Sequence, residues 1–327
     1  GDLCNSKKNT AVFGQDGTGT HYTKACIEIS GNYTAAQRFE SAAAVYNASK
    51  GEWQTAGGTK EYEWRMEPSA ADLSDVVTAW DNAVAWVVST IGNTTKFKNE
   101  FANYFTVDSM LYHFLMIEFY AAFDDVSKNT FYSYDYDEDA GGYRWNIKEA
   151  YDWDTIIACD NDGYPLGDYG IDYGDTDGAK SYFNAVTNTI WVNIKAAYQS
   201  ELSAMYTALR SLGAWDSNAV VEKWNDYQAI RPHAAMVRDA YIKYIYPYKT
   251  TGVVIGTSTY GYDDNYLGRL QGSKVYQRRQ FFTYQTDYMD GKYGYYTKTG
   301  SLQFRTNGAS GTKSLTVKVY SKTYVTI

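Results

Sequence analysis

Hydrophobic residues recur at helical spacing in two segments of the first half of the chain. In residues 67–92 the apolar positions repeat with the period of one helix face, and Ser69 with Asp72 matches a capping box at the start. Gly92 fits the end of this helix, because glycine readily adopts the left-handed conformation found there. Residues 107–122 are apolar on nearly every face, which predicts a buried helix.

Alternating apolar and polar residues indicate strands on either side of these helices. Short runs of this kind occur in the Gly-, Thr- and Ser-rich start, namely CIEIS (26–30) and EYEWR (61–65). After the buried helix, TFYSY (130–134) and YRWNIKEAYDW (143–153) flank the turn-like DEDAGG (137–142). This arrangement predicts a β-hairpin in the middle of the chain.

Helical patterns return in the second half, over residues 179–212, 217–229, 233–246 and 274–290. From residue 294 the chain alternates again and is rich in threonine. The patterns together predict an α+β fold, with a mainly helical body around a central β-hairpin. We expect a β-rich N-terminal part (1–66), an α+β domain (67–293) and a β segment that starts a further domain (294–327).

Composition and charge narrow the classes of partner. The chain has 327 residues, of which 44% are hydrophobic and 21% charged, as in folded globular proteins. Its net charge of −8 gives no electrostatic support for binding nucleic acid or an anionic membrane. No segment is long and apolar enough for a membrane span. We therefore expect neither a nucleic-acid partner nor a membrane span.

Aromatic residues are unusually frequent, with 34 Tyr, 9 Trp and 13 Phe. One interpretation is a surface that faces glycans or other proteins, where a rigid ring packs and its polar edge stays wet. The other is that tyrosine serves as a strand residue and fills a large core. Composition alone leaves both open.

A polar run, FDDVSKN, follows the buried helix directly, and YDWDT follows the hairpin. Asp124 and Asn129 have the spacing of a base and a metal-holding amide in phosphoryl transfer. Asp152 and Asp154 are two residues apart, so in a strand both would face the same ion. Because the hairpin returns the chain to its starting point, we expect these four side chains to gather around one pocket and bind a metal.

The same residues also have structural interpretations. Lys128 would neutralise phosphate charge in a catalytic site, or pair with Asp125 in a structural one. Asp152 and Asp154 would in that case cap the next loop through backbone amides. His113 lies within the apolar helix and is expected to be a hydrogen-bonded core residue.

An acidic, Gly-rich loop follows over residues 156–178. Its DNDG sequence resembles the opening of a calcium loop, but Ile171 stands where an EF-hand needs a bidentate glutamate. A looser Ca²⁺ or Mg²⁺ site held by Asp160 and Asp162 is one interpretation. A solvated acidic loop with Asx-turns is the other.

The run from HFLMIEFYAAF through DDVSKNTFYSY to YRWNIKEAYDWDT resembles the core of the CotH kinase-like family. Two later stretches, YIKYIYPY (241–248) and residues 266–293, are similar to kinase-like regions of tailed-phage structural proteins. The second contains the L-Q-G-S step and the ending Met-Asp-Gly-Lys-Tyr. The resemblance covers roughly residues 60–293 and implies a degenerate kinase-like core.

The resemblance implies a role for each matching residue. Asp124 is the base-like carboxylate, Asn129 the metal-side amide and Asp152 the metal-chelating aspartate, with Asp154 beside it. Bound Mg²⁺ and ATP are implied only for an active kinase. No glycine-rich phosphate loop precedes residue 123. The candidate cations for the phosphates are therefore Lys128 and one strand residue, either Arg65 or Lys60. Glu63 or Glu118 would be the carboxylate partner of that strand residue.

The function that the resemblance implies is a structural protein of a tailed bacteriophage, in the tail or adsorption apparatus. Its partners would be other copies or other virion proteins, and its location the virion. One alternative is an active CotH-like phosphotransferase using Mg²⁺ and ATP. Another is an adhesin, extracellular or at a cell surface, that binds host glycans through tyrosines within 132–143.

Overall fold

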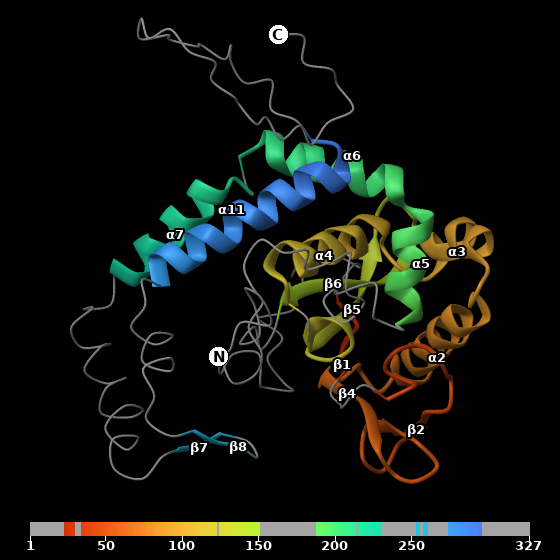
Figure 1. Cartoon of the computed structure of the whole chain (residues 1–327). Coiled ribbons are helices and arrows are strands. Elements are labelled where there is room, and N and C mark those ends of the chain that lie inside the picture. The colour runs from red at the N-terminus through yellow and green to blue at the C-terminus, as the bar shows by residue number, and fades with distance from the viewer. Residues whose placement is uncertain are drawn as a thin grey trace, which may run out of the picture.

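A six-stranded antiparallel sheet forms the centre of the molecule, with strand order β2-β3-β4-β1-β5-β6 (Figure 1). The computed structural model describes residues 23–29, 34–122, 124–150, 188–213, 215–229, 253–255, 258–260 and 274–295. The strands of the sheet are β1 (Ala25–Ile29), β2 (Val45–Asn47), β3 (Glu52–Gln54), β4 (Lys60–Met66), β5 (Thr130–Asp137) and β6 (Gly142–Ala150). A separate short hairpin consists of β7 (Val253–Ile255) and β8 (Ser258–Tyr260).

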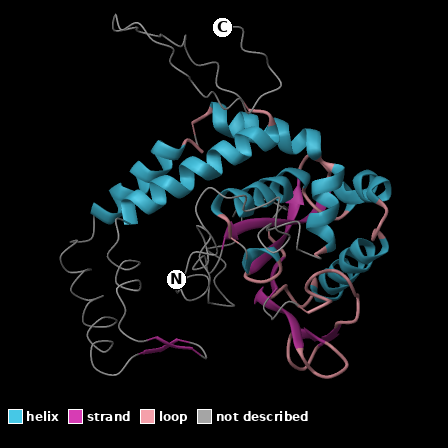
Figure 2. Ribbon diagram, in the orientation of Figure 1, coloured by secondary structure: helices cyan, strands magenta, loops and turns pink. Residues whose placement is uncertain are grey.

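The helices lie above and to the right of the strands in the view of Figure 2. The described helices are α2 (Leu73–Ser89), α3 (Thr94–Glu100), α4 (Val107–Tyr120), α5 (Thr189–Ala197), α6 (Gln199–Ser211), α7 (Ser217–Ala229) and α11 (Lys274–Tyr293). Two single 3₁₀ turns are also present: η1 (Phe101–Asn103) lies between α3 and α4, and η2 (Asp124–Val126) lies between α4 and β5. The predicted α+β class is confirmed.

The predicted central hairpin is present as β5 and β6. Tyr134 lies opposite Trp145, and Thr130 at the start of β5 lies opposite Ala150 at the end of β6. β5 also pairs with β1, which in turn pairs with β4. The N-terminal strands and the hairpin therefore form one sheet, which crosses the boundary expected between residues 66 and 67.

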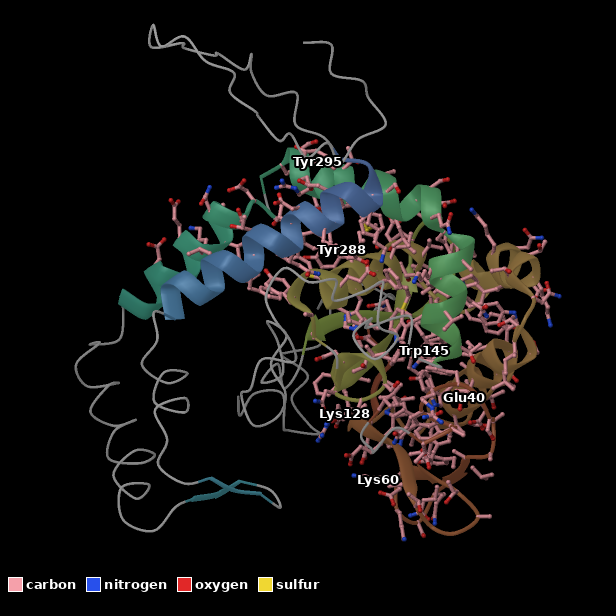
Figure 3. All side chains as sticks on the ribbon, viewed as in Figure 1. Glu40, Lys60, Lys128, Trp145, Tyr288 and Tyr295 are labelled. Carbon is pink, nitrogen blue, oxygen red and sulfur yellow. The ribbon has the colours of Figure 1, made fainter. Side chains whose placement is uncertain are left out.

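Aromatic side chains fill the core between this sheet and α2. The centroid of the Trp80 ring lies 5.2 Å from the ring centroid of Tyr62 on β4, 5.3 Å from that of Tyr132 on β5 and 4.9 Å from that of Trp145 on β6. All four side chains are buried, and Figure 3 shows Trp145 among other side chains at the centre of the body. Much of the aromatic excess thus serves packing, because large rings remove much apolar surface from water.

α2 begins at Leu73, one turn later than the cap at Ser69 suggests. The Ser69 hydroxyl does accept a hydrogen bond from the backbone N–H of Asp72 at 3.2 Å, but it caps the turn before the helix. After the helix, Gly92 has a φ of +72°, as expected of the residue that ends it. The predicted helix is present, with its boundary shifted.

α4 is the predicted buried helix, and its apolar side chains enter the core on most sides. It ends at Ala121, whose φ of +51° lies in the left-handed region. Of the segment predicted as helical over 179–212, residues 179–187 lie outside the described residues, and the rest contains two helices, α5 and α6, separated at Tyr198. The sequence pattern does not predict α3, because this helix is short and polar. Asn93 caps it by accepting a hydrogen bond from the Lys96 backbone N–H at 3.0 Å.

α7 and α11 lie side by side and extend away from the body (Figure 1). Polar contacts fasten the C-terminal end of α11 to α6. The Asp290 carboxylate accepts from Arg210 Nε at 2.8 Å, from Arg210 Nη2 at 2.9 Å and from the Tyr206 hydroxyl at 2.7 Å. No helix within the described ranges is long and apolar enough to cross a membrane. The helix predicted over 233–246 and the β segment from 296 onward lie outside the described residues.

Candidate functional site

The polar run that follows the buried helix forms a closed turn between α4 and β5. It starts with the single 3₁₀ turn η2, and Asn129 has a φ of +54°, a conformation that asparagine tolerates better than most residues. The Thr130 hydroxyl then donates back to the carbonyl oxygens of Lys128 at 2.9 Å and Asp125 at 3.2 Å. The backbone of the predicted catalytic segment is thus held by its own residues.

α5 holds the same turn from outside. The carbonyl oxygen of Val126 accepts two hydrogen bonds, one from Trp191 Nε1 at 2.7 Å and one from Asn188 Nδ2 at 3.0 Å. Both donors are buried, and Asn188 also caps the start of α5. A carbonyl with two buried donors is fully satisfied, so this part of the turn is fixed in position.

His113 of α4 lies beneath the turn and is a buried core residue, as predicted. Burial lowers the pKa of its imidazole to about 4, and a hydrogen bond to the backbone of Asp125 opposes that shift only in part. Its ring centroid lies 5.5 Å from the ring centroid of Trp191. The imidazole is therefore neutral near pH 7 and serves packing.

The two aspartates of the run occupy neighbouring positions in η2. Asp125 is fully buried, whereas the spacing in the sequence indicates Asp124 for chemistry. The backbone of Asp124 starts η2, and its side chain lies outside what the structure describes. Lys128 is half-buried, and Figure 3 shows it at the edge of the body.

A row of ionic side chains lies on the face of the sheet opposite the aromatic core. Arg65 on β4 forms an ion pair with Glu28 on β1, and its guanidinium lies 3.7 Å from Glu63. Lys60 Nζ binds the same Glu63 carboxylate at 2.8 Å. The Phe131 ring on β5 lies under the guanidinium, 5.8 Å from its carbon atom. Arg65, a strand cation that the sequence suggests, is thus close to carboxylates on two strands.

The turn leads directly into strand positions that contact this ionic row. Thr130 pairs with Ile29, and Phe131 pairs with Glu28 on β1. Asn129 directly precedes this pairing. Glu28 and Phe131 both contact the Arg65 side chain, although the Arg65 backbone lies farther along β4, beside Cys26 and Ile27. The sheet therefore brings Asn129, Lys128 and Arg65 to one region, which we call the candidate site.

Four of the predicted metal ligands, Asp152, Asp154, Asp160 and Asp162, lie outside the described residues. β6 returns as far as Ala150, opposite Thr130, so the hairpin leads the chain back toward the turn up to that residue. Among the side chains that the structure describes, no group of three or more His, Cys, Asp or Glu could hold a metal. The described part of the candidate site thus supplies no metal-ligand set.

Glu118 has a different role from the one the sequence suggested. Its buried carboxylate accepts hydrogen bonds from Lys292 and from the Tyr293 hydroxyl of α11, and its carbonyl oxygen accepts from Gln285 Nε2 at 2.6 Å. Burial, together with the negative charge of Glu118, raises the pKa of Tyr293. Glu118 therefore anchors α11 to α4, and the cation that it pairs with is Lys292 rather than Arg65 or Lys60.

Sequence reasoning missed the residues that fix the candidate site. Glu28 is the main partner of Arg65, and Asn188 and Trp191 hold the turn. An acidic residue inside the apolar run CIEIS was the available signal for Glu28, because an acidic side chain between apolar residues needs a partner when buried. A scan against models of protein families finds none that matches the chain, and a search of curated protein sequences finds no relative.

Proposed function

We propose that the chain is a structural protein of a tailed bacteriophage, in the tail or adsorption apparatus, whose kinase-like region is a scaffold that transfers no phosphate. The virion setting rests on the resemblance of residues 60–293. The scaffold role rests on the contacts of Arg65, the strand cation of the candidate site.

Phosphoryl transfer requires a cation that faces the phosphates of the nucleotide. Arg65 instead pairs with Glu28, which is 3% exposed, and lies close to Glu63. If Arg65 moved to a phosphate, Glu28 would keep a buried charge that had lost its ion-pair partner, which costs several kcal/mol. A kinase strand cation also keeps a carboxylate partner, but the Arg65 side chain is only 14% exposed and its guanidinium lies over the Phe131 ring, so little of it is open to a phosphate. This burial favours a structural role for Arg65.

Nucleotide binding tests the scaffold role. We expect the melting temperature of the protein to stay unchanged when ATP and Mg²⁺ are added, and calorimetry to detect no binding. The Asp152→Ala variant should behave like the wild type. A Mg²⁺-dependent rise in melting temperature that disappears in Asp152→Ala would replace the scaffold proposal by an active phosphotransferase.

Particle composition tests the virion role separately. Mass spectrometry of purified phage particles from a culture that produces this chain should detect its peptides. Antibodies raised against the chain should label the tail or the adsorption apparatus in electron micrographs. Peptides found only in the particle-free supernatant would overturn the virion role, whatever the nucleotide result.

Glycan binding is a second candidate, favoured by three tyrosines of the central hairpin. Tyr134, Tyr136 and Tyr143 are half-buried, and the Tyr143 ring lies 5.4 Å from each of the other two. Rings of this kind can stack on sugars while their hydroxyls stay in water. By contrast Tyr132 belongs to the core and cannot contribute.

A glycan array distinguishes glycan binding from a purely structural role. We expect a protein that binds sugars through the hairpin to lose the signal in Tyr136→Ala and Tyr143→Ala. Tyr112→Ala is the matched control, because that tyrosine is exposed on α4, away from the hairpin. Failure of the wild type to bind any host-surface sugar would remove the glycan candidate.

A further inference from the structure

The carboxyl group of Glu61 on β4 is fully buried, and its Oε2 accepts a hydrogen bond from the Thr34 hydroxyl. Its Oε1 is also buried and has no hydrogen-bond partner among the described residues. An ionised carboxylate in this position would hold a buried charge with a single donor, so the surroundings favour the protonated form. Burial accordingly raises the pKa of Glu61, and the bond from Thr34 opposes that shift only in part.

The other charged side chains of β4, of its two neighbouring strands and of residues 34–40 are engaged with one another. They form three ion pairs, and one further glutamate accepts a hydrogen bond from Gln54: Lys60 with Glu63, Arg65 with Glu28, Arg38 with Glu40, and Glu52. Within the described ranges, none of these cations forms an ion pair with Glu61. Ionised Glu61 would therefore gain little from the charges around it.

A tight turn, residues 34–38, closes over this carboxyl group. The Thr34 N–H donates to Gln37 Oε1 at 3.2 Å, and the Gln37 N–H donates to Thr34 Oγ1 at 3.4 Å. The Gln37 side chain also donates to the carbonyl oxygen of Glu61 at 3.3 Å, and the Tyr62 hydroxyl donates to that of Ala36 at 2.6 Å. The Thr34 hydroxyl links the turn to the carboxyl group, because it accepts from the turn and donates to Glu61.

The two ends of this turn differ in how firmly they are held. Phe39 directly follows it and has a φ of +53°, a conformation that is unfavourable for a bulky side chain. Its ring is buried, with its centroid 6.3 Å from that of Trp80, so core packing maintains the conformation. At the other end Thr34 is half-buried and Ala35 is exposed. Water therefore reaches Glu61 once this end of the turn lifts.

The same turn fixes the start of α5. The Thr189 N–H donates to the carbonyl oxygen of Arg38 at 2.9 Å. The Asn188 Nδ2 donates to the carbonyl oxygen of Gln37 at 3.5 Å and to that of Val126 at 3.0 Å. One buried side chain thus joins residues 34–38 to the turn of the candidate site, and a movement of the first turn removes a contact that positions this donor for the second.

We propose that residues 34–38 are a latch that is closed over neutral Glu61 and opens when this carboxyl group ionises. The closed latch fixes the start of α5 and, through Asn188, supports the turn that carries Lys128 and Asn129. In the open state water solvates the carboxylate, and both contacts of α5 with the latch are lost. Opening is a local event of the kind that hydrogen exchange detects in folded proteins.

A closed latch is favoured at low pH. With the latch open, the carboxyl group of Glu61 titrates at its ordinary pKa of 4.5, and with the latch closed its pKa is higher. The closed state is therefore fully favoured below pH 4.5, and this preference is lost as the pH rises through the folded pKa. His113, beneath the turn of the candidate site, has the opposite dependence, because burial lowers its pKa.

Hydrogen exchange of the full chain between pH 4 and pH 8, corrected for the intrinsic pH dependence of amide exchange, tests the latch. Glu61→Gln keeps an acceptor for the Thr34 hydroxyl and cannot ionise. Relative to this variant, the wild type should lose protection in 34–40 about tenfold per pH unit above 4.5 and then level off. Glu52→Gln is the matched control, because Glu52 is half-buried on the neighbouring strand, and this variant should follow the wild type.

Two results would overturn the latch: wild-type protection that runs parallel to that of Glu61→Gln over the whole range, or a Glu52→Gln variant that loses the pH dependence as well. Circular dichroism verifies that each variant is folded. If Glu61→Gln fails to fold, the wild type alone decides, because flat protection of residues 34–40 from pH 4 to pH 8 contradicts the proposal.

The amides of residues 124–130 test the coupling through Asn188. Their protection should fall over the same pH interval as that of residues 34–40, and the fall should be absent in Glu61→Gln. If protection falls in 34–40 and stays constant in 124–130, the support of the candidate site by the latch is excluded. The latch needs no nucleotide and no other virion protein, so its success or failure is separate from that of the virion role.

Discussion

Trp191 donates its indole N–H to the carbonyl oxygen of Val126 at 2.7 Å, across 65 residues of sequence. Both groups are buried, and the bond joins α5 to the turn between α4 and β5. Trp191→Phe removes this donor together with the pyrrole part of a buried ring, so it also loses packing. Asn188 still binds the same oxygen, so we expect the lost hydrogen bond to contribute about 1 kcal/mol beyond the packing loss in the free energy of unfolding, measured by urea denaturation.

Trp86→Phe is the matched control for this prediction. Trp86 also donates its indole N–H, to Glu100 at 2.8 Å, but Glu100 is half-buried. Its carboxylate can bind water after the change, so the loss should be smaller. An equal loss in both variants would mean that the contact with Val126 contributes nothing beyond ring packing.

Local patterns predicted the elements of this fold but not the contacts between distant segments. The period of α4 and the alternation of β5 and β6 are properties of neighbouring residues, and the structure confirms both. The donors from Asn188 and Trp191 come from a helix more than sixty residues later. Nothing near Val126 in the sequence indicates that its carbonyl oxygen has partners there.

The strand order explains why Glu28 was missed as the partner of Arg65. The sequence suggests two carboxylate partners, Glu63 close to Arg65 and Glu118 on the buried helix. In the sheet, β1 lies between β4 and β5, so it contributes Glu28 directly beside Arg65. Strand order depends on how the whole chain packs, and alternation within one strand does not encode it.

Arg65→Met should destabilise the protein strongly. The change keeps much of the apolar side chain and removes the cation that neutralises Glu28, whose side chain is 3% exposed. Removing one partner of a buried ion pair costs about 3–5 kcal/mol. Arg38→Met is the control, because Arg38 and Glu40 are about one-third exposed and their pair should contribute no more than about 1 kcal/mol. Urea denaturation of both variants measures the difference, and similar losses would show that Glu28 is accessible to water.

His113 should make the stability of the protein depend on pH between about 6.5 and 4. The unfolded chain binds a proton on this imidazole below its ordinary pKa of 6.5, whereas burial lowers the folded pKa to about 4. Stability is therefore complete above pH 6.5 and is lost as the pH falls toward 4. From pH 7 to pH 5 we expect a loss of about 2 kcal/mol from this group.

His113→Gln provides the comparison for the pH prediction. The variant keeps the other two histidines, His21 and His233, so the difference between the two proteins isolates one group. Its stability should fall less than that of the wild type between pH 7 and pH 5, even if the substitution lowers stability at both. If the free energy of unfolding falls equally with pH in both proteins, the His113 imidazole becomes protonated in the folded state without a loss of stability.

The attachment of α11 depends on Glu118 and can be tested against an exposed pair of the same residue types. Lys292 and Glu118 are 23% and 7% exposed, whereas Lys98 and Glu201, 2.7 Å apart, are 43% and 41% exposed. Lys292→Met leaves the Glu118 carboxylate with Tyr293 alone, so we expect a loss of about 2–3 kcal/mol. Lys98→Met should cost at most about 1 kcal/mol, because water replaces the lost contact. Hydrogen exchange localises the effect: amide protection should fall in α11 in the first variant and stay unchanged there in the second. Full protection of α11 in Lys292→Met would mean that Asp290 and the aromatic contacts hold the helix without Glu118.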